Sequence, residues 1–180
     1  DVSVEAHREL YEKEIEAFGT VFTIVSMQKI GTSAVQSRAT GGVAGGTYLF
    51  ALPGSPGGPR IILTSVPDEL HVIGLLMVEA LFTLEGADCI PLGTQMPLLE
   101  IARAASAHRA DIVALSFSVA FPQRQIPGLL QQLRLVVPPE IGLWAGGGGV
   151  ARVAKMDGVV LLTALDNALL ALNDWRAAHP

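Results

Sequence analysis

A histidine with a carboxylate two positions before it is the clearest candidate for chemistry in this sequence. His71 is one of four histidines, and it follows Glu69 within the segment 65–74. At that spacing in a loop, the carboxylate accepts a hydrogen bond from one ring nitrogen while the other nitrogen faces a ligand. Metal-bound histidines commonly have such a partner, which fixes the tautomer. The pair therefore indicates a metal or cofactor site, and the alternative is a surface histidine near the start of a helix.

Two serines and a run of glycines are the other candidate features. Ser116 and Ser118 lie at the end of an apolar segment, and we expect one hydroxyl to donate to a ligand and the other to backbone. Gly146 and Gly147 open a run of four glycines, which permits close approach to a bulky group, positive φ angles, or a phosphate site at a helix start. Each feature alone is a weak signal, because hydroxyls at strand ends and glycine runs are common.

Short apolar segments alternate with longer amphipathic ones from residue 60 onward. The expected strands are 60–66, 88–92, 111–117, 141–145 and 159–162, and the expected helices are 71–85, 96–108, 123–136, 149–155 and 165–178. Continuous apolar strands are typical of a parallel sheet covered by helices on both faces. We therefore expect a flavodoxin-like, doubly wound α/β fold with a five-stranded parallel sheet of order 2-1-3-4-5. Ligands of such sheets bind beyond the carboxyl ends of the strands, where the candidate residues fall.

The first third of the chain differs in composition from the rest. Residues 1–40 have roughly helical apolar spacing and acidic early turns, and we expect a short helical segment there. Residues 41–59 are rich in glycine and proline, which predicts a connector. The expected organisation is thus a helical segment over 1–40, a connector over 41–59 and one domain over 60–180.

Composition limits the partners that this chain can have. It has 180 residues, of which 50% are hydrophobic, and a net charge of -5. DNA binding would normally need a basic face, so we expect DNA contacts only through a separate domain. The lone Cys89 rules out an internal disulfide framework, and no apolar run approaches the ~20 residues of a membrane span. We expect a cytoplasmic protein without a membrane partner.

The candidate residues also match the motifs of a known family. Glu69-x-His71-x-x-Gly74, Ser116-x-Ser118 and Gly146-Gly147 resemble the D-x-H-x-x-G, S-x-L and G-G motifs of B12-binding domains, in the same order. With Glu in the first position, the segment 61–86 is similar to the sensory B12-binding domains of MerR-type light-responsive regulators (the CarH/LitR group). The resemblance covers about residues 60–178.

The resemblance implies a cobalamin cofactor, either adenosylcobalamin or methylcobalamin. It implies that His71 is the lower axial ligand of cobalt, that Glu69 orients this histidine, and that Gly74 leaves room for the displaced nucleotide tail. It also implies that a slot for the tail is lined by Ser116, Ser118, Gly146 and Gly147.

The same resemblance predicts a non-enzymatic sensory domain of a bacterial transcriptional regulator. It also predicts that the regulator is a homo-oligomer and that it serves as a B12-dependent photoreceptor. One alternative is a corrinoid carrier subunit for a methyltransferase or a mutase. Another is an interaction domain that has lost corrin binding. The light-responsive regulators place a tryptophan-bearing four-helix bundle before the B12 domain, whereas the first tryptophan here is Trp144. A phosphorylation receiver of the same sheet order would need an aspartate where Ser116 stands.

Overall fold

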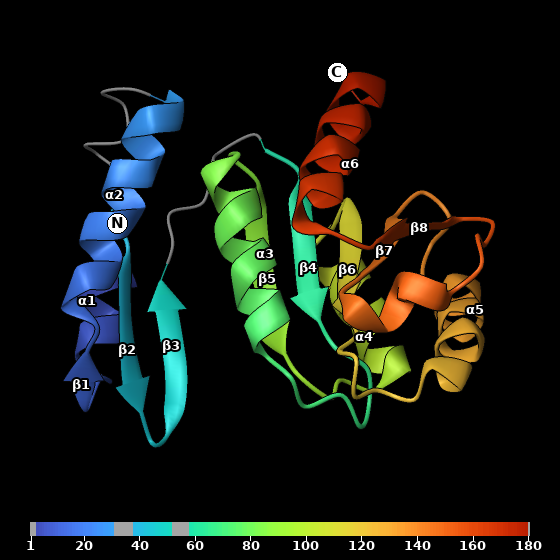
Figure 1. The fold of residues 1–180 in the computed structure, drawn as a ribbon, viewed down its shortest axis with the longest axis horizontal. Helices are drawn as coiled ribbons and strands as arrows, with labels where there is room; N and C mark the ends of the chain where they lie inside the picture. Colours follow the sequence, from blue (N-terminus) through green and yellow to red (C-terminus); the bar gives the residue numbers. More distant parts are fainter. Residues whose placement is uncertain (1–2, 31–37, 52–57, 180) are drawn as a thin grey trace. The chain divides into compact units, whose positions relative to one another are not determined.

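The computed structural model describes residues 3–30, 38–51 and 58–179. The chain divides into two compact units, Asp1–Gly54 and Ser55–Pro180. Figure 1 shows the helices and strands of each unit, which are described separately below. No helix among the described residues is long and apolar enough to cross a membrane.

The first unit combines helices with a small antiparallel sheet. Its elements are α1 (Ser3–Arg8), β1 (Lys13–Glu14), α2 (Glu16–Ile30), β2 (Thr40–Ala44) and β3 (Thr47–Ala51). The sheet has the order β1-β2-β3. Gly45 and Gly46, with φ of 55° and 77°, form the two-residue turn between β2 and β3. Two consecutive positive φ angles suit the right-handed twist of the paired strands.

The predicted organisation of residues 1–59 is wrong in two places. The expected helical segment is interrupted by β1, and residues 41–51 of the expected connector form strands instead. The glycines of β2 are explained by aromatic packing. A Cβ on Gly41 would lie 2.6 Å from the ring of Phe50, and one on Gly42 would overlap the ring of Tyr11. The remaining parts of these expectations, residues 31–37 and 52–57, lie outside the described residues.

The second unit is a parallel sheet with helices on both faces. Its strands are β4 (Arg60–Thr64), β5 (Asp88–Gly93), β6 (Ile112–Ser116), β7 (Gly142–Gly146) and β8 (Val159–Leu162), and its α-helices are α3 (Ile73–Leu84), α4 (Leu98–Ala107), α5 (Ile126–Val136) and α6 (Leu165–Ala178). The strand order is β5-β4-β6-β7-β8, with every pair parallel. This is the predicted order 2-1-3-4-5, and the flavodoxin-like α/β fold is confirmed.

The structure differs from the predicted helices of the second unit in type and in starting residue. The segment 149–155, expected to be an α-helix, is the short 3-10 helix η3 (Gly148–Arg152), and a second 3-10 helix, η2 (Gln123–Gln125), precedes α5. The helix expected from residue 71 begins at Ile73, so His71 lies in the loop before α3. Because His71 lies outside the helix, its orientation depends on contacts with other residues of the site.

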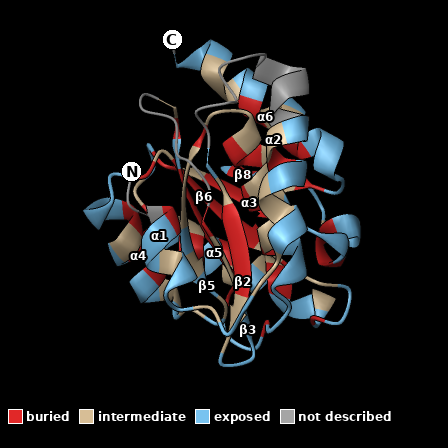
Figure 2. Ribbon diagram, turned by 90° about the vertical axis from the view of Figure 1, so that its left-hand side faces the viewer, coloured by how far each residue is buried: buried red, intermediate tan, exposed pale blue. Residues whose placement is uncertain are grey.

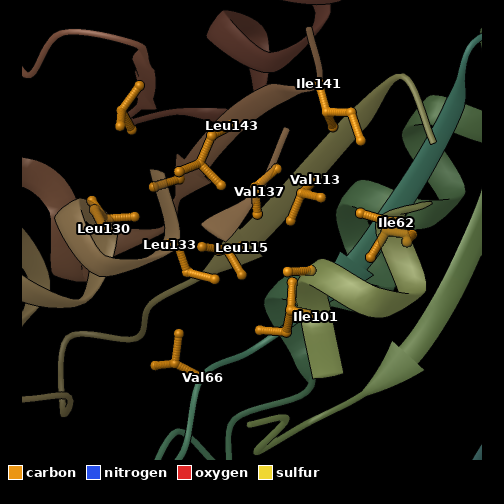
Figure 3. Close-up of a cluster of buried hydrophobic side chains, with 14 of the residues drawn as sticks. Ile62, Val66, Ile101, Val113, Leu115, Leu130, Leu133, Val137, Ile141 and Leu143 are labelled. Carbon is orange, nitrogen blue, oxygen red and sulfur yellow. The ribbon is translucent and has the colours of Figure 1, made fainter. Parts of the chain in front are cut away.

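Alternating side chains of the strands fill a separate core on each face of the sheet. One core joins the sheet to α4 and α5, and Figure 3 shows it through Ile62, Val113, Leu143 and their neighbours. The other joins Ile61 and its neighbours to α3 and α6. Figure 2 shows burial concentrated along the strands, as expected for a parallel sheet covered on both faces. The sheet is thus a rigid support for the loops at its carboxyl edge.

Candidate functional site

The candidate residues lie on three loops at the carboxyl edge of the sheet. β4 leads into the loop that carries Glu69 and His71, β6 ends at Ser116, and β7 ends at Gly146. Parallel strands end at the same edge, so these loops are neighbours although they are far apart in sequence. Residue pairing confirms this, because Ser116 of β6 pairs with Gly146 of β7.

The first loop is held in shape by a buried serine. The Ser65 hydroxyl donates to the Glu69 carbonyl at 2.6 Å and accepts the Gln95 N–H at 3.0 Å. The Glu69 N–H donates to the Val66 carbonyl, and Asp68 between them has a φ of 68°. Aspartate tolerates this left-handed conformation. The turn directs the side chain of Glu69 inward, where it is 1% exposed.

Glu69 connects the first loop to the loop after β6. Its Oε1 accepts the backbone N–H of His71 at 3.0 Å and the His71 Nδ1–H at 2.7 Å, and its Oε2 accepts the Ser118 N–H at 2.7 Å. Burial alone would raise the pKa of this carboxyl, but the N–H groups of Ser118 and His71 and the imidazole outweigh it. The pKa of Glu69 therefore lies below its usual value. Glu69 is an anion near neutral pH, with both oxygens engaged.

The Glu69 carboxylate fixes the tautomer of His71. An ionised carboxylate only accepts hydrogen bonds, so the proton of a neutral His71 ring must sit on Nδ1. Nε2 then carries the lone pair, and the side chain is 61% exposed. Among the described residues, no three His, Cys, Asp or Glu side chains gather to hold a metal ion. A metal on Nε2 would therefore need its other ligands from a non-protein group.

A cavity opens beside Ser116, on the α3 and α6 side of the sheet. Its volume is about 230 Å³. Gly74, in the first turn of α3, lies at this cavity, and a Cβ there would be 2.8 Å from the Ser116 hydroxyl. Glycine at this position therefore lets the helix approach β6 closely. The cavity is lined by Gly74, Leu75, Met77, Val78, Phe82, Ala114, Leu115, Ser116, Trp144, Gly146, Gly147, Gly148, Leu162, Thr163, Ala164, Leu165 and Ala168.

The glycines after β7 form a turn that other residues would disrupt. Gly147 has a φ of 97°, and a Cβ on it would overlap the carbonyl oxygen of Phe117. Its N–H donates to the Leu162 carbonyl at 3.3 Å. Gly146, by contrast, has only ordinary contacts around a Cβ position. The turn keeps backbone rather than side chains at the cavity wall.

Ser118 has a buried hydroxyl without a hydrogen-bond partner among the described residues. The side chain of Ser118 lies at the Glu69 carboxylate, where it helps to lower the pKa of that carboxyl. Its N–H binds Glu69, which holds His71. Ser116 and Gly74 are brought together at the cavity, and Ser118, Glu69 and His71 are brought together beside it.

Sequence reasoning missed several residues that shape this site. Ser65 supports the first loop, and the apolar cavity wall includes Phe82, Trp144 and Ala168. Ser65 follows a strand directly, which was a usable signal. The cavity wall had no sequence signal of its own, because it depends on the register that sets the small Ala114 beside Trp144.

Residues 59–161 match the family model described as B12 binding domain. This match covers more than half of the chain, and the matched segment holds the Glu69–His71 pair, Gly74, Ser116, Ser118 and the glycines after β7. The chain belongs to the B12-binding domain family, and cobalamin is the cofactor of such a domain.

Two solved structures share the fold of the second unit. A cobalamin-binding protein from Desulfitobacterium hafniense has 19% identity and a TM-score of 0.50, over 66% of this chain and 60% of that one. The methanol:cobalamin methyltransferase complex MtaBC from Methanosarcina barkeri has 20% identity and a TM-score of 0.54, over 67% of this chain and 47% of that one. At these identities the likeness establishes the fold.

A different class of protein shares a shorter stretch of sequence. Molybdenum cofactor biosynthesis protein B of Escherichia coli K12 is 51% identical over 55 residues, which are 31% of this chain and 32% of that protein. The chain spans less than half the length of the curated relatives that it matches.

Proposed function

We propose that the second unit binds cobalamin with the nucleotide base displaced from cobalt and His71 Nε2 in its place. The observation that carries this proposal is the Glu69–His71 pair, with Nδ1 bound to a buried carboxylate and the ring exposed. The corrin would supply the metal ligands that the described protein residues do not. Cobalamin would contribute a cobalt centre whose upper ligand can be exchanged or transferred.

Further features of the site fit this cofactor. The cavity beside Gly74 and Ser116 can take the displaced nucleotide tail. Exposed apolar side chains flank His71, among them Leu70 and Ile73. Such a surface suits the largely apolar edge and face of a macrocycle.

The chain's own residues have positioning roles in this proposal. Glu69 would hold His71 in one tautomer, with the lone pair of Nε2 available to cobalt. No residue of the site is assigned to bond making or bond breaking, so we propose a non-enzymatic corrinoid-binding domain, located in the cytoplasm. In the sensory form of this proposal it belongs to a homo-oligomeric bacterial transcriptional regulator, with DNA read by a separate domain and light as the candidate signal. The support is the motif resemblance.

A corrinoid carrier for a methyltransferase is the second candidate. It is favoured by the secondary structure of the first unit. This unit contains the sheet β1-β2-β3, whereas a light-responsive regulator has a helical bundle before its B12 domain. The methyltransferase complex with a similar fold agrees with it. Both candidates require the same ligation by His71.

We also infer that the first unit is the part related to the molybdenum cofactor proteins. The stretch of 55 residues shared with the Escherichia coli protein is close in length to this unit, which ends at Gly54. Other relatives share 75 to 77 residues, so their similarity includes residues beyond the unit. We assign no molybdenum chemistry to this chain, because the match covers about a third of the Escherichia coli protein.

An absorption spectrum tests cobalamin binding, and size-exclusion chromatography before and after illumination separates the two forms of the proposal. The full chain is incubated with adenosylcobalamin in the dark, desalted and then illuminated. Retained corrinoid with the spectrum of histidine ligation supports the proposed site, and release of all corrinoid contradicts it. A change of molecular size on illumination supports the sensor, and an unchanged size supports the carrier.

Replacing Glu69 by glutamine should weaken cobalamin binding by about tenfold. The amide keeps the size of the side chain but removes the charge. In either orientation its NH₂ group faces an N–H donor of His71 or of Ser118, from which it cannot accept a hydrogen bond. Titration followed by absorbance measures the dissociation constant. Glu140→Gln, at an exposed position, is the matched control, and an unchanged constant for Glu69→Gln would remove the positioning role.

Filling the cavity should block the nucleotide tail. Ala168→Leu adds bulk to a residue of α6 that lines the cavity, and we expect cobalamin to bind about tenfold more weakly, since the tail loses its apolar contacts. Cobinamide, which lacks the nucleotide, should bind the variant and the wild type alike. Ala171→Leu is the control, because Ala171 packs on the same core without lining the cavity. Equal losses for both corrinoids would show that the tail lies elsewhere.

A further inference from the structure

The cavity has a polar mouth and an apolar floor. Ser116 pairs with Gly146 at the carboxyl ends of β6 and β7, and Thr163 directly follows β8. Ala114 pairs with Trp144 two residues deeper in the same strands. The register thus sets hydroxyls and loop backbone at the mouth, and methyl and ring groups below them.

No side chain of the floor presents a hydrogen-bonding group to the cavity. Phe82 of α3 meets Trp144 edge to face, with ring centroids 5.9 Å apart, and Ala168 of α6 adds a methyl group. The indole nitrogen of Trp144 lies beside Gly142, 3.4 Å from the position of a Cβ there. Gly142 is at the start of β7, so this nitrogen points away from the mouth.

We infer that this cavity selects corrinoids whose lower base is an apolar bicyclic ring, such as dimethylbenzimidazole, over those with adenine. This inference rests on the proposed function. The size is suitable, because an apolar cavity of about 150 Å³ already holds benzene, and this one measures about 230 Å³. A fused bicyclic base with methyl substituents matches both the volume and the lining.

Adenine would lose hydrogen bonds in this cavity. Its amine and additional ring nitrogens occupy edges where dimethylbenzimidazole has carbon atoms and methyl groups. Once buried against Phe82, Trp144 and Ala168, these polar groups have no partner. Each unpaired group weakens binding by roughly tenfold, and such factors multiply. We therefore expect the adenine cobamide to bind at least about a hundredfold more weakly than cobalamin.

The test compares three corrinoids on the full chain. Dissociation constants are measured by absorbance for hydroxocobalamin, the corresponding cobamide with adenine as lower base, and cobinamide. Cobalamin binding at least about a hundredfold tighter than the adenine cobamide supports the inference. Equal binding of the two complete corrinoids overturns it, while retained histidine ligation in both leaves the proposed function intact. Failure of all three to bind overturns the proposed function and this inference together.

A serine variant in the apolar floor of the cavity, compared with the same substitution on the other face of the sheet, tests whether the floor sets the preference for cobalamin. Ala114→Ser adds a hydroxyl to the cavity and should narrow the preference for cobalamin severalfold, because adenine gains a partner. Ala145→Ser adds the same hydroxyl on the opposite face of the sheet and should leave the preference unchanged. If Ala114→Ser does not fold, Ala168→Ser introduces the hydroxyl from α6. A preference that neither cavity variant narrows would contradict selection by the floor.

Discussion

Replacing His71 by alanine will remove nitrogen ligation from the lower face of cobalt and weaken cobalamin binding by at least about a hundredfold. Loss of partners outside the ligand shell commonly costs 10-fold to 100-fold in metal affinity, and loss of the ligand itself should exceed that. The absorption spectrum of any corrinoid that remains should differ from that of the wild-type complex. Absorbance titration gives both the affinity and the ligation state.

A second histidine provides the control for this change. His108 is exposed and follows α4, so His108→Ala should bind cobalamin as the wild type does. An unchanged spectrum for the His71→Ala complex would show that another group occupies the lower face of cobalt.

Replacing Glu79 by glutamine will stabilise the protein at alkaline pH by about 3 kcal/mol. Glu79 lies in α3 and is 7% exposed, and burial raises the pKa of its carboxyl to about 7, from a usual value of 4.5. The folded state therefore holds a proton on Glu79 that the unfolded state releases. This contribution to stability is fully present below pH 4.5, is lost as pH rises to about 7, and changes no further above that.

Glutamine keeps the size of the side chain and has no charge to bury. The variant and the wild type should therefore be equally stable at pH 4, and should diverge between about pH 4.5 and 7. Urea denaturation across this pH range measures the difference, with Glu140→Gln at an exposed position as control. A constant difference between variant and wild type at all pH values would rule out titration of Glu79 as the cause.

The parallel sheet could be predicted from sequence because its strands are continuously apolar. Segments such as Ile61–Leu63 are buried on both faces, which leaves a continuous run of aliphatic residues that is visible in the sequence. The strands β2 and β3 could not be predicted in the same way. Positions 41 and 42 require glycine because the rings of Phe50 and Tyr11 cover them. This packing cannot be seen in the sequence, where the segment has the composition of a linker.

In the candidate site too, contacts between residues close in sequence could be predicted and contacts between distant residues could not. The spacing of Glu69 and His71 is local, and the motif pointed to a carboxylate–imidazole hydrogen bond that the structure contains. The bond from the Ser118 N–H to Glu69 joins residues 49 positions apart, and no local pattern indicates it. The unpaired Ser118 hydroxyl and the apolar cavity also arise only when β4, β6 and β7 are set in register.

Electron paramagnetic resonance of the reduced, cobalt(II) complex tests the ligation by His71 most directly. The unpaired electron on cobalt couples to the nucleus of an axial nitrogen, so the isotope of that nitrogen changes the splitting. Protein labelled with ¹⁵N-histidine and loaded with unlabelled cobalamin should show doublets, because the ligand is His71 Nε2. Triplets that persist in the labelled protein would show that the nucleotide base of cobalamin still occupies the lower face, and would contradict the account.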